Sequence, residues 1–391
     1  MTLQSAANPQ ILQYKANQFL ACVVVNRFLL WIETSRRFVL IEQPVFEVFE
    51  ELSKGSSLLE IAILFESRYQ LPIDECVPFV ADVATRIDAL LSETPPQISS
   101  ILKLDSTLLP ACTYISCYKF EKKILKLNCH NERLRHLFHP LFSHLEIPDN
   151  SQPDLTLSLF EWNDTLCLQS SNTLVTYWKR DDIPHFKGEV LGQIINLIYG
   201  KTDADWMMTT HASGLTDGNT AILFSAEAGA GKSTIAALLQ ARGFELLSDD
   251  FIAVDLDSNA YRFYMAMSVK SGAVSTLVES YPELTNVAPQ LAANGKEVSF
   301  LPPNKPSSAN SSYPIRAVVL VVYNENIECN FSQISAVEAV QRFLPEVYVT
   351  PNEVAVMRFM YFVQSTRFYT LQYSNNDTAI SQIENLFKDE K

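Results

Sequence analysis

Long basic runs are missing from this chain of 391 residues. No run of lysine and arginine is longer than a pair, as at Lys122-Lys123, and the formal net charge is −14. A protein that binds the phosphate backbone of a nucleic acid needs a basic patch on its surface. We therefore expect no nucleic-acid partner.

The chain also lacks the segments that mark export or membrane insertion. No apolar stretch approaches the roughly 18 residues that a membrane-spanning helix needs, and residues 1–9 contain neither the charged nor the apolar region of an export signal. The seven cysteines are odd in number and scattered, as is typical of reduced thiols. These features predict a cytoplasmic protein with no membrane span.

The composition that is present indicates a packed protein of several domains. Hydrophobic residues make up 47% of the chain and aromatic residues 11%, which is typical of globular proteins. We expect three parts, residues 1–97, 98–204 and 205–391, with the Pro-rich stretch 93–97 at the first boundary. In residues 98–204 the pattern predicts short strands and a helix at 188–199. We expect this part to be a mixed α/β segment that packs on residues 205–391, and we find no candidate site residue in it.

A phosphate-binding loop is the strongest motif in the sequence. Residues 226–234 read Ala-Glu-Ala-Gly-Ala-Gly-Lys-Ser-Thr and match the pattern A/G-x-x-x-x-G-K-S/T. An apolar run at 220–225 predicts a strand before the loop, and residues 234–242 predict a helix after it, which is the context that this motif requires. The residues expected to surround the phosphates are Ala228, Gly229, Ala230, Gly231, Lys232, Ser233 and Thr234.

The chemistry of the loop predicts binding of a nucleoside triphosphate. Backbone N–H groups of a glycine-rich loop can turn toward phosphates, and the following helix adds the positive end of its dipole. Lys232 is expected to reach the β- and γ-phosphate oxygens, and the Ser233 hydroxyl to complete the coordination of Mg²⁺. We therefore expect ATP and Mg²⁺ as cofactors, although GTP fits the motif equally.

Two adjacent carboxylates follow the loop. Residues 244–251 read Phe-Glu-Leu-Leu-Ser-Asp-Asp-Phe and predict a strand that ends at Asp249 and Asp250. Such a pair allows one carboxylate to hold the metal and the other to take a proton from an acceptor hydroxyl. We favour Asp249 as the base and Asp250, with Ser233, as the metal ligand, while the reverse assignment is also compatible with the sequence.

The loop, the Ser-Asp-Asp segment and the upstream His211-Ala-Ser-Gly214 together resemble the bacterial HPr kinase/phosphorylase family. The resemblance covers about residues 205–391 and is sharpest over 211–254. It implies a P-loop kinase core of the HPr-kinase/PEP-carboxykinase type, which transfers a phosphoryl group to a serine. It also implies that the catalytic residues are Asp249, Asp250, His211 and Lys232.

One departure from that family concerns the acceptor. The Glu-(Ile/Val)-Arg-Gly-x-Gly signature is absent after residue 254, where the chain instead reads Ser268-Val-Lys-Ser-Gly272. The chain thus looks like the divergent HPr-kinase-related proteins of peptide-modification and cell-envelope operons. HPr itself is then not the expected acceptor, and the reverse phosphorylase reaction stays an open question.

The N-terminal part predicts a small α+β domain. Strands are expected within 20–41, and three helices within 44–91, the second with a capping box at Ser57 and Glu60. This pattern resembles the winged-helix-like PqqD domain, whose members hold a leader peptide as an added strand. A generic accessory domain is the alternative.

Three functions are compatible with these features. The first is a kinase for a serine or another hydroxyl on a peptide or protein that the N-terminal domain recruits. The second is a kinase for a small hydroxylated metabolite, with a structural N-terminal domain. The third is a non-catalytic nucleotide-binding module or a peptide chaperone that hydrolyses ATP. A homo-oligomer is compatible with all three.

Overall fold

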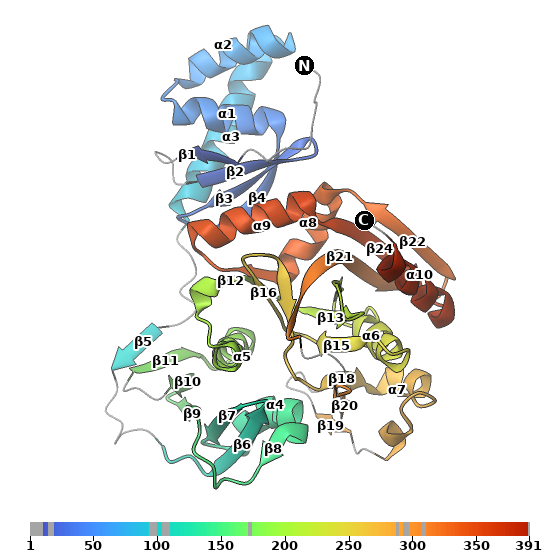
Figure 1. Ribbon diagram of the computed structural model, residues 1–391. Coiled ribbons are helices and arrows are strands. Elements are labelled where there is room, and N and C mark those ends of the chain that lie inside the picture. Colours follow the sequence, from blue (N-terminus) through green and yellow to red (C-terminus); the bar gives the residue numbers. More distant parts are fainter. Residues whose placement is uncertain are drawn as a thin grey trace. The chain divides into compact units, whose positions relative to one another are not determined.

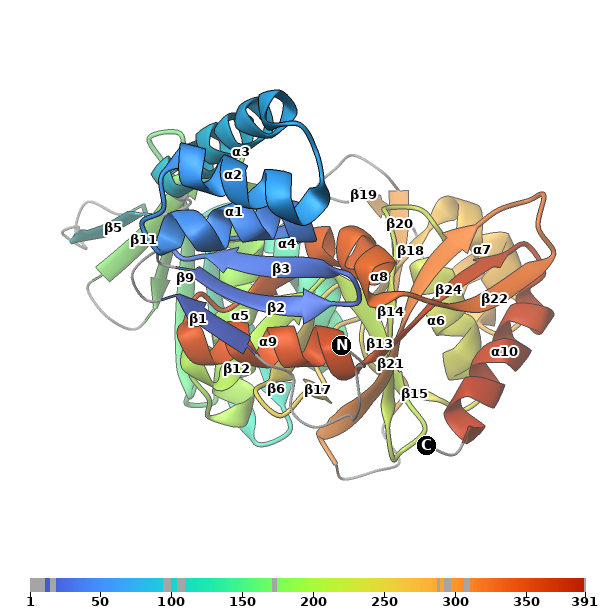
Figure 2. The same ribbon diagram turned by 90° about the horizontal axis from the view of Figure 1, so that it is seen from above.

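The computed structural model describes residues 11–14, 19–93, 100–103, 110–170, 174–286, 289–291, 297–305 and 310–389. These residues form a mixed α/β protein with several sheets, as expected, and the chain divides into two compact units (Figures 1 and 2). The first unit comprises residues 1–96, 334–344 and 351–366, and the second comprises residues 97–333, 345–350 and 367–391.

A small antiparallel sheet and three helices form the first unit's N-terminal part. Across the sheet the strands are β1 (Ile11–Tyr14), β2 (Phe19–Val24), β3 (Arg27–Ile32) and β4 (Arg37–Glu42). The helices are α1 (Gln43–Ser53), α2 (Leu58–Tyr69) and α3 (Ile73–Ser92). The predicted capping box is present, since Ser57 Oγ accepts from the Glu60 N–H and the Glu60 carboxylate accepts from the Ser57 N–H. The strands and helices expected within 20–91 are confirmed, and β1 was not predicted.

Two helices from the C-terminal part of the chain complete the first unit. These are α8 (Ala336–Phe343) and α9 (Glu353–Ser365). Both faces of the sheet are covered, with α1–α3 on one side and α9 on the other (Figure 1). Leu30 packs with α1–α3, whereas Trp31 contacts Phe38, whose ring lies 5.1 Å from that of Phe359 in α9. This explains why β3 is apolar at nearly every position.

The position of α8 and α9 corrects the expectation that both helices belong to the C-terminal core. A side chain of α9 also bonds to the N-terminal sheet, since Gln364 Nε2 donates to the carbonyl oxygen of Val23 at 2.6 Å. The boundary expected at 97/98 lies outside the described residues. The boundary at 204/205 remains a prediction, because residues on both sides belong to the second unit.

The sheet that carries the phosphate-loop motif lies in the second unit. Its strand order is β15-β13-β14-β21-β17-β16-β12-β23, and β24 pairs with both β21 and β22. The strands are β12 (Trp206–Thr210), β13 (Ala212–Thr216), β14 (Ala221–Ser225), β15 (Glu245–Ser248), β16 (Ile252–Asp255), β17 (Asn259–Tyr261), β21 (Ser312–Tyr323), β22 (Cys329–Ile334), β23 (Val347–Val349) and β24 (Arg367–Tyr373). Strands β14, β21 and β24 are parallel neighbours. Their carboxyl ends therefore meet at one edge of the sheet.

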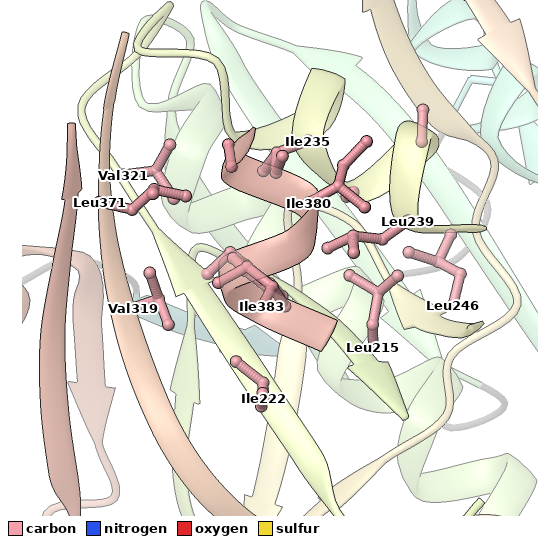
Figure 3. Packing of buried hydrophobic residues seen from close by; sticks show 14 of the residues in the cluster. Leu215, Ile222, Ile235, Leu239, Leu246, Val319, Val321, Leu371, Ile380 and Ile383 are labelled. Carbon is pink, nitrogen blue, oxygen red and sulfur yellow. The ribbon is translucent and has the colours of Figure 1, made fainter. Parts of the chain in front are cut away.

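Helices α6 (Lys232–Ala241) and α10 (Asn376–Lys388) pack together against these strands. Figure 3 shows the buried side chains that join them. Nearby are α7 (Ser271–Leu277) and a small sheet of β18 (Met267–Lys270), β20 (Glu297–Leu301) and β19 (Gln290–Leu291). The cluster in Figure 3 includes Leu215, Ile222, Ile235, Leu239, Leu246, Val319, Val321, Leu371, Ile380 and Ile383.

A further sheet and two helices precede that core in the sequence. The sheet has the order β5-β11-β10-β9-β7-β6-β8 and packs with α4 (Glu132–Phe142) and α5 (Ile183–Tyr199). The strands are β5 (Ser100–Lys103), β6 (Tyr114–Phe120), β7 (Lys123–Cys129), β8 (Glu146–Ile147), β9 (Leu155–Trp162), β10 (Thr165–Ser170) and β11 (Leu174–Lys179). One buried cluster joins these elements to Phe251 and Phe263 of the loop-bearing part. In the described part of the chain, no helix has the length and apolar character needed to cross a bilayer.

Candidate functional site

The glycine-rich loop connects the end of β14 at Ser225 to the start of α6 at Lys232. Gly229 and Gly231 have φ angles of 97° and 92°, in the left-handed region that favours glycine. Space gives a second reason for glycine at 231, since a Cβ there would lie 2.7 Å from the hydroxyl of Tyr373. The strand, loop and helix that the motif predicts are therefore present, with the helix beginning two residues earlier than expected.

The pairing of β13 brings the two carboxylates beside the loop. This strand pairs with β14 on one side and with β15 on the other, where Gly214 lies opposite Ser248. Asp249 and Asp250 follow Ser248 directly. The chain leaves the extended conformation at Asp250, whose φ angle is 67°, a left-handed value that aspartate tolerates better than most residues. The alternation of side chains along a strand ends there, and both carboxylates reach the same partner.

That partner is Lys232, the lysine of the loop. Its ammonium lies 3.1 Å from Asp249 Oδ1 and 2.5 Å from Asp250 Oδ1. The side chain is buried, and burial alone would lower the pKa of this ammonium. The two carboxylates outweigh that effect and raise the pKa above its ordinary value. Lys232 is therefore a fixed positive charge between two negative ones.

Two serine hydroxyls bind the more deeply buried carboxylate. Ser213 Oγ donates to Asp249 Oδ1 at 2.5 Å, and Ser233 Oγ donates to Asp249 Oδ2 at 2.9 Å. Only 1% of the Asp249 side chain is exposed. Ser233 thus contacts Asp249, and not Asp250, with which we had paired it as a metal ligand. Ser213 was not among the predicted site residues.

Asp250 faces a more open part of the site. Its side chain is 31% exposed, and His211 Nε2 lies 3.4 Å from its Oδ1. Burial would raise the pKa of this carboxyl, but Lys232 and His211 outweigh burial and lower it to about 2. His211 lies between β12 and β13, where its backbone N–H donates to the Glu346 carbonyl at 2.8 Å. The structure therefore brings the predicted His211, Lys232, Asp249 and Asp250 together.

Lys187 is a further cation at this site, and the sequence did not reveal it. The side chain comes from α5 and is half-buried. Burial lowers the pKa of its ammonium, while the negative charges of Asp250 and Asp249 favour the protonated form. Lys187 therefore lies within the electrostatic reach of both carboxylates.

The signal for Lys187 was its position on the buried side of α5. It precedes Val190 and Leu191 by one turn, and both are buried, so a lysine occupies the inward stripe of an amphipathic helix. We expected that helix to begin at 188, whereas it begins at Ile183 with Pro184 in its first turn. Lys187 consequently fell outside the expected helix.

Lys270 is a second cation that sequence reasoning did not select. It is the last residue of β18, and its side chain is exposed. A Cβ placed on Gly229 would lie 3.8 Å from Lys270 Nζ. The ammonium group therefore lies beside the glycine-rich loop, in the segment where the family signature is absent.

The residues of this cluster fit a magnesium ion that is bound partly by substrate. Within the described ranges, no group of three or more His, Cys, Asp or Glu residues is arranged to hold a metal by itself. Mg²⁺ usually takes one or two carboxylates and completes its shell with waters and phosphates. Ser233 and Asp249, joined by a hydrogen bond at the foot of the loop, have the oxygen ligands for that mode.

Comparison with solved structures gave weak similarity, of which one example follows. No family model matches the chain, and no curated protein matches it. The structure of the Hpr(Ser) kinase/phosphatase from Coxiella burnetii aligns over 46% of this chain and 93% of that protein, with 14% sequence identity and a TM-score of 0.23. A TM-score this low establishes neither the fold nor the activity of the present chain.

Proposed function

We propose that this protein is an ATP-dependent kinase of the HPr-kinase-related type, which transfers the γ-phosphoryl group to a hydroxyl of a peptide or protein. The observation that carries the proposal is the meeting of Lys232 and Ser233 with Asp249 and Asp250 in one hydrogen-bonded cluster. A lysine, a hydroxyl and carboxylates at the end of a glycine-rich loop are the groups that a Mg²⁺–nucleotide site uses.

The charged groups of the cluster can exchange their present ion-pair partners for a triphosphate and a magnesium ion. A buried charge that loses its partner is costly, so each group that leaves an ion pair must gain another. A triphosphate offers oxygens to the Lys232 ammonium, and a magnesium ion takes up the carboxylate charge. The observed arrangement therefore holds each side chain close to where its ligand would bind.

We assign the metal role to Ser233 and Asp249, and the proton-accepting role to Asp250. Asp249 is almost fully buried and shares a hydrogen bond with Ser233, as a pair of metal ligands would. Asp250 is more exposed and lies beside His211, so an acceptor hydroxyl from solvent can approach it. This assignment reverses the one that we favoured from the sequence. Bound Mg²⁺ would supply neutralisation of phosphate charge.

Nucleotide binding would also activate Asp250. The pKa of about 2 depends on the nearby Lys232 ammonium, and a carboxylate of that pKa is a poor proton acceptor. When Lys232 turns toward phosphate oxygens, the pKa of Asp250 rises toward its ordinary value. Asp250 would then be a better proton acceptor than it is beside the Lys232 ammonium.

Two further elements support the proposal. Lys187 and Lys270 add positive charge beside the carboxylates and the loop, as a bound triphosphate requires. All seven cysteines are free thiols, which supports a cytoplasmic kinase with access to ATP.

Calorimetry with Mg²⁺–ATP tests the nucleotide site. The wild-type protein should bind Mg²⁺–ATP, and Lys232→Ala should bind it far more weakly, because the ammonium that neutralises the phosphates is lost. Lys122→Ala is the matched control, since Lys122 is an exposed lysine in the turn between β6 and β7. Wild-type affinity in Lys232→Ala would reject the loop as the site.

Recruitment of a peptide by the N-terminal part is best tested on the substrate. Deleting residues 1–95 would remove the partners of α9 within the first unit and leave that helix uncovered, so the truncated chain would not be a clean test. A serine peptide with its leader segment should show a lower KM than the same peptide trimmed to the acceptor, with kcat unchanged, because remote binding is lost. Equal KM values would favour a metabolite kinase.

A further inference from the structure

Two tyrosines lie at the edge of the sheet that carries the glycine-rich loop. Strand β14 leads into the loop, β21 pairs with it in parallel, and β24 pairs in parallel with β21; β21 and β24 end at Tyr323 and Tyr373. Ligands of open α/β sheets bind at the carboxyl ends of the strands. Both rings are therefore on the side of the sheet where a nucleotide would bind.

Tyr323 is attached to the loop by its backbone and presents its ring to solvent. Its N–H donates to the Ala230 carbonyl at 3.0 Å, and a Cβ on Gly231 would lie 3.4 Å from Tyr323 Cβ. The residue is nevertheless 47% exposed. An exposed ring this close to a phosphate-binding loop can contact what the phosphates carry.

Tyr373 packs against the Tyr323 ring. The two ring centroids are 5.7 Å apart with an interplanar angle of 85°, an edge-to-face contact. Tyr373 is buried, and its hydroxyl donates to the Gly231 carbonyl at 3.3 Å. The position of the Tyr323 ring is thus fixed by contacts with the loop and with Tyr373, and part of its surface stays open.

The charge around Tyr323 favours an uncharged ligand group. Glu325 and Glu328 follow it in the connection to β22, and both are exposed. Carboxylates repel phosphate, whereas they leave the stacking of a neutral aromatic base unaffected. The phosphate chain therefore fits beside the lysines of the site, and a neutral base fits beside Tyr323.

We infer that the exposed surface of Tyr323 is the stacking platform for the nucleobase of the bound nucleoside triphosphate. This inference rests on the proposed function and adds the subsite that recognises the nucleoside. Stacking of a base on an aromatic side chain is sequence-tolerant, because every base has a π-face. The platform therefore contributes affinity for the base in addition to the affinity that the loop has for phosphate.

Calorimetry of the full-length protein with two probes, Mg²⁺–ATP and inorganic tripolyphosphate with Mg²⁺, tests the inference. Wild type should bind ATP more tightly than tripolyphosphate. Tyr323→Ala should weaken ATP binding on the order of tenfold to a hundredfold and leave tripolyphosphate binding unchanged. Tyr323→Phe keeps the ring and should bind ATP as wild type does. Tyr114→Ala, which removes an exposed tyrosine of another sheet, is the control.

Unchanged ATP affinity in Tyr323→Ala, or an equal loss for both probes, would overturn the platform and leave the proposed function intact. If Tyr323→Ala does not fold, the test is the wild-type protein's affinity for the two probes. Equal affinity for ATP and tripolyphosphate would exclude any contribution from the base and overturn the platform. Wild type that binds neither probe would overturn the proposed function together with the inference.

Discussion

Replacing Lys232 with alanine should destabilise the ligand-free protein by about 3 kcal/mol. The Lys232 ammonium lies 2.5 Å and 3.1 Å from two carboxylates. Removing one partner of a buried ion pair costs about 3–5 kcal/mol, because a charge stays buried without compensation. We expect the lower end of that range, since Asp249 keeps two hydroxyl donors and the Asp250 side chain is 31% exposed.

Urea unfolding followed by tryptophan fluorescence measures this loss. Three of the four tryptophans, at 162, 178 and 206, belong to the second unit, so their signal follows the unit that contains the site. Mg²⁺–ATP at a hundred times its Kd should stabilise wild type by about 2.7 kcal/mol. The same concentration should stabilise Lys232→Ala much less, because its affinity is lower.

A second substitution separates the ion pair from other effects of the change. Lys232→Ala combined with Asp250→Asn should recover part of the lost stability, because the uncompensated carboxylate is then neutral. The exposed Lys122→Ala should have wild-type stability. If Lys232→Ala without nucleotide proves as stable as wild type, the idea that Lys232 compensates two buried carboxylates is refuted.

Four further outcomes are expected. In urea titrations, the stability difference between wild type and Lys232→Ala should be constant from about pH 5 to 9 and should shrink below about pH 4. The pKa of Asp250 is lowered to about 2 in the folded protein. The stability that ionised Asp250 contributes above its unfolded pKa of about 3.9 is therefore lost as the pH falls toward 2. Asp250→Asn should still bind Mg²⁺–ATP but slow phosphoryl transfer by about 10²–10⁴-fold. Asp249→Asn should raise the Mg²⁺ concentration needed for ATP binding. The opposite pattern in these two assays would restore Asp249 as the base and Asp250 as the metal ligand. Lys187→Met should lower kcat/KM for ATP about tenfold in a hydrolysis assay, equivalent to about 1.4 kcal/mol, and unchanged kinetics would remove Lys187 from the site. Gly231→Ala should lose ATP binding in calorimetry and cost about 1–2 kcal/mol of stability in urea unfolding, because its φ angle of 92° is unfavourable for alanine; wild-type binding would show that the loop tolerates a side chain there.

The parts of the site that lie close together in the sequence could be predicted. The loop and the two carboxylates are separated by one helix, and their residue types match a known chemistry at fixed spacing. His211 was found only through the family resemblance, since a lone histidine carries no spacing signal. The structure brings it to Asp250 because β13 pairs with both β14 and β15.

Residues that reach the site from other elements could not be predicted. Lys187 depends on where α5 begins, and helix boundaries are the least certain feature of a sequence pattern. Lys270 depends on how β18 approaches the loop, a contact between residues 41 positions apart that local periodicity does not encode. The fold shows the same division, since the strands and helices within 20–91 were predicted whereas the association of α8 and α9 with them was not.

The association of α8 and α9 with the N-terminal sheet has a consequence for biosynthesis. The first unit is interrupted after residue 96 and is completed only by residue 366, which the ribosome adds 270 residues later. At about 5–20 residues per second this delay is roughly 15 to 50 s. During that time the sheet face that α9 later covers, with Trp31 and Phe38, is exposed on the nascent chain. A ribosome-associated chaperone that binds apolar strands could bind this face during synthesis. Premature termination before residue 353 would leave the face without α9 to cover it.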